Sequence, residues 1–212
     1  MQRALGISRT TLRQIARLLE GEGILKVKRG SYGGYFGCRP SLSSIEAAVT
    51  EHLGKLDVRI EELLTIASIT WSEALRQAAN LRNREAKVLA TKLSTTVRSM
   101  DPLIAYQDLV ALEKSIRSAV FGLIGSPYMQ FMFKVNMSFA QQKFDEDLQM
   151  PADVDQHRTF VEAWRDAKLL ELQAIILGDQ DLAVLAAQRT RQAWARTIKK
   201  RQANDNLIAP QG

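Results

Sequence analysis

The sequence predicts a mainly α-helical protein, in which a short helix and a β-hairpin precede an all-α bundle of six to seven helices. The hydrophobic pattern changes twice within the first 40 residues, from a helical period to strand-like alternation. Beyond residue 44 only helical patterns recur, separated by capping residues, glycines and prolines. We therefore expect two domains, residues 1–40 and residues 41–212.

The first helix is expected to begin at Ser8, which is a good N-cap residue. Apolar residues then recur at Leu12, Ile15 and Leu19, the spacing of one buried helical face. Glycines at 21 and 23 end this helix. The sequence therefore predicts an amphipathic helix of about three turns.

Residues 24–28 alternate as a strand does, residues 29–34 form a glycine-rich turn, and Tyr35-Phe36 begin a second strand. A helix followed by a hairpin is the second half of a winged helix-turn-helix. The helical pattern that follows is expected to start with a capping box of Ser43 and Glu46. The later helices are expected at about residues 44–53, 57–80, 82–98, 102–124, 127–147, 152–177 and 180–202, with starts at Asp101-Pro102, Ser126-Pro127, Pro151 and Gly178-Asp179.

Positive charge is concentrated at the N-terminal end of the chain. Residues 1–39 hold eight Lys or Arg and two acidic residues, whereas residues 40–212 hold 21 of each sign. Concentrated positive charge suits a polyanion, although a solvated basic surface is an equal alternative on charge alone. The single Cys38 excludes an internal disulfide, and no run approaches the length of a membrane span. We expect a cytoplasmic protein that does not bind a membrane.

Four polar residues of the first helix share the face opposite its apolar residues: Arg9, Thr10, Arg13 and Arg17. A helix that lies in the DNA major groove needs this arrangement, because arginine can bond guanine through two acceptors. Lys26 and Lys28 share one strand face and are placed to meet the DNA backbone. The alternative is an ordinary surface helix with basic residues.

The motifs of this segment resemble the DNA-binding signature of GntR transcriptional regulators. The matching stretches are Leu5-Gly6-Ile7-Ser8-Arg9-Thr10-Thr11-Leu12-Arg13, Leu18-Leu19-Glu20-Gly21-Glu22-Gly23-Ile24-Leu25, Arg29-Gly30 and Gly33-Gly34. The resemblance implies double-stranded DNA as the partner, with the wing tip at residues 32–34 near the minor groove. It implies DNA contacts by Ser8, Arg9, Thr10, Thr11, Arg13, Arg17, Lys28, Arg29 and Gly33.

Relatives of this type carry about 25 to 30 further residues before this segment, so we expect the winged helix to lack its first helix. Two functions follow. One is a ligand-responsive regulator that binds a palindromic operator as a homodimer. The alternative is a ligand-binding or dimerisation protein that has lost DNA binding through the truncation.

Residues 44–202 resemble the FCD effector domain of the FadR-like branch, through Ala78-Ala79, Gly125-Ser126-Pro127 and the segment 174–179. This resemblance implies a small organic acid as effector and a homodimer. It places Glu113, Arg117, Lys168 and Thr190 where many FCD domains hold a metal, and Ala67 and Trp71 where an Arg and a Glu are usual.

With only His52 and His157, a three-histidine site is excluded, so we expect neither metal nor cofactor. We expect Glu113, Arg117 and Lys168 to bind the anionic effector, or else Glu113 to pair with Arg117 or Lys168. His157 is expected in an exposed cap neighbourhood, and the basic run 189–201 on a solvated last helix. No catalytic motif is recognised, so we do not expect an enzyme.

Overall fold

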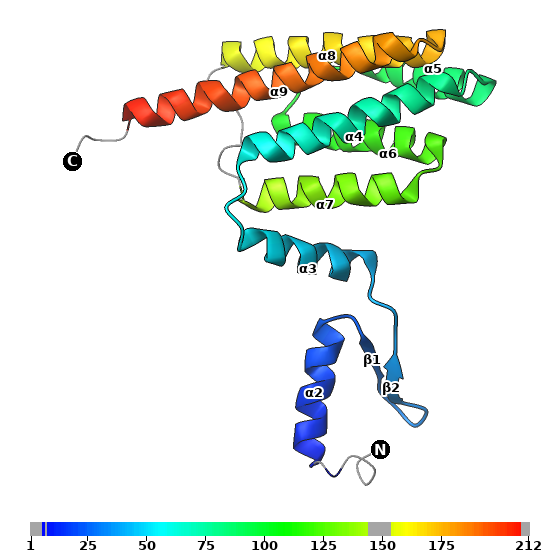
Figure 1. Ribbon diagram of the computed structural model, residues 1–212, viewed down its shortest axis with the longest axis vertical. Coiled ribbons are helices and arrows are strands. Elements are labelled where there is room, and N and C mark those ends of the chain that lie inside the picture. The colour runs from blue at the N-terminus through cyan, green and yellow to red at the C-terminus, as the bar shows by residue number, and fades with distance from the viewer. Residues whose placement is uncertain (1–5, 7, 144–153, 209–212) are drawn as a thin grey trace. The chain divides into compact units, whose positions relative to one another are not determined.

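The computed structural model describes residues 6, 8–143 and 154–208, with side chains described as far as residue 196. Over these residues the chain forms eight helices and one two-stranded hairpin (Figure 1). The mainly helical fold class is therefore confirmed. Contacts divide the chain into two compact units, residues 1–56 and 57–212. The expected division fell after residue 40, so the helix between residues 42 and 54 groups with the hairpin.

The first unit begins with helix α2, Arg9–Gly21. Gly23 follows the helix with a positive φ of 71°. The amide of Gly23 donates to the carbonyl of Glu20, and the amide of Ile24 donates to that of Leu19. This pair of bonds is the Schellman termination, which favours glycine at the left-handed position. The chain then turns directly into the first strand.

Strands β1, Leu25–Lys28, and β2, Gly34–Gly37, pair antiparallel with Val27 opposite Tyr35. The amide of Gly33 donates to the carbonyl of Gly30 and closes the turn between them. The expected hairpin and its boundaries are thus confirmed to within a residue.

Helix α3, Leu42–Gly54, completes the first unit. The expected capping box at Ser43 is wrong. Ser41 is the N-cap, and its hydroxyl accepts a hydrogen bond from the amide of Ser44 at 3.1 Å. In a run of serines the pattern alone does not distinguish which hydroxyl lies at the non-helical position, because each can cap.

The second unit is an all-α bundle of six helices within the described residues. They are α4 Ile60–Asn80, α5 Arg84–Arg98, α6 Tyr106–Ile124, α7 Pro127–Lys143, α8 Val154–Leu177 and α9 Gln180–Ile208. The starts at Ser126-Pro127 and Gly178-Asp179 are confirmed, and the Asp179 carboxylate caps α9 by accepting from the amide of Leu182 at 2.9 Å. The expected start at Pro151 lies outside the described residues, as do Leu5 and Ile7.

The expected helix start at Asp101-Pro102 is wrong, because α6 begins at Tyr106. The Asp101 carboxylate accepts from the amide of Leu103 at 2.7 Å, and its carbonyl accepts from Ile104. Both bonds fold a local turn in place of a first helical turn. Asp is able to make either structure, and here the turn is formed.

Helix α4 is the centre of this bundle, since it contacts α6, α7, α8 and α9 (Figure 1). Its Ala74, Ala78 and Ala79 are fully buried. On the neighbouring helices, Ala86, Ala90, Ala174, Ala183 and Ala187 are buried as well. Small side chains let helix axes approach closely and leave the aromatic residues to fill the remaining space.

The membrane expectation concerns helix length and composition. Within the described part of the chain, none of the helices combines the length and the apolar content needed to span a bilayer.

Candidate nucleic-acid interface and a buried charge cluster

The polar face of α2 is exposed. Arg9, Thr10, Arg13 and Arg17 are all solvent-accessible, and they lie within about one quadrant of the helix at 100° per residue. Neither Arg13 nor Arg17 forms an ion pair with any residue that the structure describes. Two guanidinium groups therefore face solvent, and none of the described carboxylates pairs with them.

Ser8 and Thr11 are joined by hydrogen bonds at the start of α2. The Ser8 hydroxyl accepts from the amide of Thr11 at 3.1 Å, and the two hydroxyls lie 2.8 Å apart. Ser8 is therefore the N-cap that the sequence predicted. Because both side chains are engaged in the cap, they define where the helix starts, while Arg9, Thr10 and Arg13 present the outward-facing groups.

Helix α2 is joined to the hairpin by packing and by one hydrogen bond. Ala16 is buried, Leu12 and Leu19 are half-buried, and the Glu20 carboxylate accepts from the amide of Val27 at 3.1 Å. At 100° per residue, Leu12 and Leu19 lie on the side of α2 away from Arg17, whereas Glu20 lies on the same side as Arg13. The hairpin therefore packs along one edge of the arginine face and leaves Arg13 and Arg17 exposed.

The hairpin carries its own basic residues. Lys28 and Arg29 are exposed, and the Lys28 ammonium lies 5.2 Å from the centre of the Phe36 ring. At the tip, Tyr32 is 96% exposed. Gly33 is required there, because a Cβ atom would collide with the carbonyl oxygen of Lys28. The turn thus holds an exposed aromatic ring beside two cations.

The apolar face of α2 differs from the sequence-based expectation. Ile15 is 44% exposed and Leu18 is 65% exposed, although Ile15 was expected in the buried stripe. The two-stranded hairpin is too small to cover the full width of the helix, so it buries Ala16 and leaves Ile15 at its margin.

In the second unit, the structure brings together the three residues expected to bind an effector. The Arg117 Nε lies 2.6 Å from Glu113 Oε1, an ion pair whose geometry is out of line for a hydrogen bond. Lys168 Nζ donates to Glu113 Oε1 at 3.2 Å and lies 3.1 Å from Oε2. Both pairings of the alternative expectation, Glu113 with Arg117 and Glu113 with Lys168, are therefore present.

A second carboxylate, Glu171, completes this charge cluster. Its Oε2 accepts from Lys168 Nζ at 2.6 Å, and its Oε1 accepts from Trp71 Nε1 at 2.9 Å and from the Thr190 hydroxyl at 2.6 Å. Lys168 and Glu171 are fully buried. Two cations and two carboxyl groups thus lie together among α4, α6, α8 and α9.

Aromatic rings surround the cluster. The Lys168 ammonium lies 5.1 Å from the ring of Trp71 and 5.8 Å from that of Trp164, and the Arg117 guanidinium lies 5.1 Å from the ring of Phe133. Ring faces attract cations, which offsets part of the cost of burying them. These aromatic residues therefore stabilise buried charge as well as filling the core.

The pKa values of the two carboxyl groups are shifted in opposite directions. Burial acts to raise the pKa of Glu113, but Arg117 and Lys168 together hold that pKa below its ordinary value. Burial raises the pKa of Glu171 above its ordinary value; Lys168 opposes this shift and the charge of Glu113 adds to it. Glu113 is therefore the more strongly acidic member of the cluster.

The sequence predicted most of the residues of this cluster, but not all of them. Glu113, Arg117, Lys168, Thr190 and Trp71 were all singled out, and all meet here. Glu171 was missed. The available signal was its place three residues after Lys168 on one helix, a spacing that brings opposite charges onto the same face. Effector binding at this site stays a prediction, since both cations already have carboxylate partners.

His157 is buried, which contradicts the expectation of an exposed cap neighbourhood. Its Nε2 lies 2.7 Å from the carbonyl of Ile104, in the turn before α6. Because α6 begins only at Tyr106, Ile104 lies in a turn whose carbonyl is able to meet His157 of α8. His52 is exposed on α3. Among the residues that the structure describes, no three His, Cys, Asp or Glu side chains gather as a metal centre.

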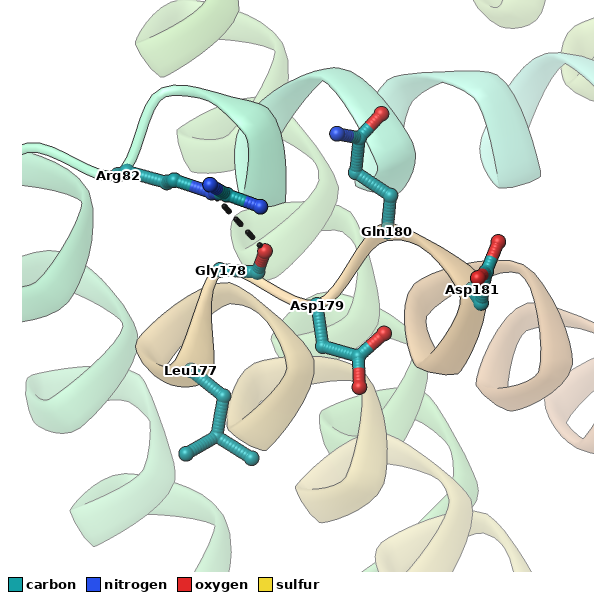
Figure 2. Close-up of a pocket in the computed structure, with 6 residues that line it drawn as sticks. All are labelled: Arg82, Leu177, Gly178, Asp179, Gln180 and Asp181. Atoms are coloured by element: carbon teal, nitrogen blue, oxygen red, sulfur yellow. Dashed lines mark hydrogen bonds between the residues drawn. The ribbon is translucent and has the colours of Figure 1, made fainter.

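A surface pocket lies where the α4–α5 and α8–α9 turns meet. Figure 2 shows the Arg82 side chain reaching to the carbonyl of Gly178, to which its Nε donates at 3.3 Å, while Asp179 points away from it. Arg82 has a φ of 48° and Gly178 a φ of 70°. Gln180 bonds Arg76 and Asn80. These polar groups are engaged in joining the two turns.

No family model matches this chain, and no curated protein matches it significantly.

Proposed function

We propose that this protein is a DNA-binding transcriptional regulator that recognises double-stranded DNA with helix α2 in the major groove. The observation that carries the proposal is the exposed face of α2, where Arg13 and Arg17 have no ion-pair partner among the described residues. Arginine forks on such a face match the two acceptors of guanine. The sequence resemblance to GntR regulators, carried by the same residues, supports it.

The hairpin supports the same proposal. Lys28 and Arg29 are exposed beside the tip residue Tyr32. Basic groups at a wing neutralise phosphates next to the groove that a recognition helix occupies. Residues 1–39 contribute a net charge of +6, which equals that of the whole chain. The electrostatic attraction to DNA would therefore come from the unit that carries α2.

Selection from a randomised duplex library tests this function. Enriched duplexes should share a sequence, arranged as an inverted repeat if two copies bind. Affinity should fall linearly on a log–log plot against salt, with a slope of about −0.9 per phosphate neutralised. The double variant Arg13→Glu/Arg17→Glu should lose the enrichment, whereas Arg158→Glu, an exposed change on α8, should keep it. Equal behaviour of the two variants, or no enriched sequence, would refute the proposal.

The proposal includes a small organic acid as the effector. Arg117 is the more solvent-accessible of the two cations in the cluster, since its side chain is 17% exposed while Lys168 is fully buried. A carboxylate from solvent would compete with Glu113 for Arg117. Succinate and citrate are suitable probes, because a ligand that binds the folded state raises Tm. Arg117→Ala should remove any such rise, and an unchanged rise would place the ligand elsewhere.

The second candidate function is a ligand-binding or dimerisation protein that does not bind DNA. The exposure of Ile15 and Leu18 favours it, because a recognition helix supported on one side only is held less rigidly. The library selection separates the two functions. A folded chain that dimerises or binds succinate, but enriches no duplex, has this second function.

A further inference from the structure

We propose that the C-terminal half of α9 binds the phosphate backbone of duplex DNA, as a second contact that reads no base sequence. Residues 182–204 hold six Lys or Arg and no acidic residue, whereas acidic residues outnumber basic ones over the rest of residues 40–212. The zero net charge of residues 40–212 therefore conceals a basic helix. This contact goes beyond the proposed function, because it lies in the second unit and adds to the attraction that the first unit exerts.

Two basic side chains in the middle of this helix are exposed and unpaired. Arg189 and Arg196 are solvent-accessible, and neither forms an ion pair with any residue that the structure describes. Arg191 differs, because it lines a groove between α4 and α9 with Ile69, and its Nη2 donates to the Thr65 hydroxyl at 3.0 Å. Arg189 and Arg196 are therefore open to an anion from outside the chain.

The adjacent helix α4 does not neutralise this charge. Its first turn carries Glu61 and Glu62, and α4 packs against α9. Glu62 pairs with Arg59 at 3.0 Å, and neither glutamate forms an ion pair with α9 among the described side chains. A polyanion is therefore able to bind α9 without breaking an ion pair of the described bundle.

The basic residues form a row along one side of α9. At about 100° per residue, Arg189 and Arg196 lie about 20° apart around the helix, and the positions of Lys199 and Lys200 fall within about 60° of Arg196. At about 1.5 Å per residue, the row from 189 to 200 is about 17 Å long. Figure 1 shows α9 continuing past the N-terminal ends of α4 and α8. Such a row is longer than a single small anion and suits DNA, which carries one negative charge per about 1.7 Å of its axis.

A basic helix also suits a lipid surface, but the surroundings of α9 favour nucleic acid. A helix that lies on a membrane inserts its apolar face between the lipids. The apolar face of α9 is occupied, because Ala183, Ala187 and Ala193 are buried in the bundle. Leu185 is the one large apolar side chain that is exposed on the described part of α9. The exposed side otherwise carries amide and guanidinium groups, which donate to phosphate oxygens.

The salt dependence of binding to a random-sequence duplex tests this contact in the full chain. Arg189→Ala/Arg196→Ala should reduce the slope of log affinity against log salt by about 1.8, because each phosphate neutralised contributes about 0.9. Affinity for a selected duplex should fall by the same factor, since a backbone contact reads no sequence. The control Arg98→Ala/Arg158→Ala removes the same charge from exposed positions on α5 and α8 and should keep the wild-type slope. Equal slopes for the two double variants would overturn the proposal.

A second background separates this contact from recognition by α2. In Arg13→Glu/Arg17→Glu, random duplex should still bind at low salt, and adding the two α9 substitutions should again reduce the slope by about 1.8. That result supports the α9 contact even if α2 recognises no sequence. If the α9 substitutions change nothing in this background, or if it binds no duplex at low salt, the proposal is wrong.

Vesicles of phosphatidylserine and phosphatidylcholine test the lipid alternative by co-sedimentation. We expect the wild-type chain and Arg189→Ala/Arg196→Ala to sediment with them to the same extent, because α9 has no free apolar face to insert. Vesicle binding that is lost in this variant, together with an unchanged slope on DNA, would overturn the proposal and assign the basic row to a membrane surface.

Discussion

The indole nitrogen of Trp164 donates a hydrogen bond to Glu113 Oε2 at 2.8 Å, which joins α8 to α6 across 51 positions of sequence. Trp71 on α4 makes the equivalent bond to Glu171. Each tryptophan therefore orients one of the two carboxyl groups that hold the Lys168 ammonium. The cluster joins four helices through groups that would be costly to bury singly.

Removing the central cation should destabilise the protein strongly. Lys168→Met leaves Glu113 and Glu171 buried beside each other, so we expect a loss of about 3–5 kcal/mol in the free energy of unfolding. Urea denaturation measures it. Lys114→Met, an exposed change on α6, is the matched control and should alter stability by less than about 0.5 kcal/mol. Similar losses for the two variants would show that the cluster contributes little.

Stability should fall in acid through Glu113. Its pKa is below the ordinary value in the folded chain, so its contribution is present above the unfolded pKa of about 4.3 and is lost as pH falls through the folded value. Glu171 acts oppositely: its raised pKa gives stability at low pH that is lost as pH rises through the folded value.

We therefore expect Glu113→Gln to flatten the dependence of unfolding free energy on pH below about 4.3. Urea denaturation at a series of pH values measures this slope. Glu162→Gln, an exposed change on α8, serves as the control. A Glu113→Gln slope identical to that of the wild-type chain would contradict the assignment.

Arg13→Ala should separate sequence recognition from general attraction to DNA. We expect it to weaken binding to a selected duplex by about 1–3 kcal/mol more than binding to random duplex, because the arginine fork contacts a base. Fluorescence anisotropy with both duplexes measures the difference. Arg98→Ala, an exposed change at the end of α5, should affect neither duplex. Equal losses on the two duplexes would place Arg13 on the phosphate backbone instead.

Gly33→Ala should distort the wing. A Cβ atom at this position collides with the carbonyl oxygen of Lys28, so the turn must open. We expect amide chemical-shift changes along residues 25–37, with the free energy of unfolding of the first unit lowered by about 1 kcal/mol or more. Gly37→Ala is the control, since no atom lies within 4 Å of a Cβ built there. Matching spectra for the two variants would show that the turn tolerates a side chain.

Much of the fold follows from local patterns. The termination of α2 before Gly23, the hairpin register around Val27 and the start of α7 at Pro127 each depend on residues close in sequence. Capping and turn chemistry act over a few residues, so a sequence pattern suffices to predict them. Where two local structures compete, as at Ser41 or Asp101, the pattern did not decide between them.

The buried cluster depended on more distant relationships. Helical spacing indicates that Glu113 and Arg117 share a face, but not that Lys168 reaches Glu113 from 55 positions away. Glu171 went unnoticed for the same reason, because its bonds to Trp71 and Thr190 exist only once three helices have packed. Desolvation acts to raise the pKa of both glutamates, and it too exists only in the assembled bundle.

By itself, the sequence determined the order of helix, hairpin and helical bundle, and the concentration of basic residues on one face of α2. These features are periodic or compositional, and each is specified within a few turns of chain. Only the tertiary structure decided that Lys168 lies between Glu113 and Glu171, and that Ile69 and Arg191 border one groove. Burial and contact between distant residues arise from packing, which no local pattern encodes.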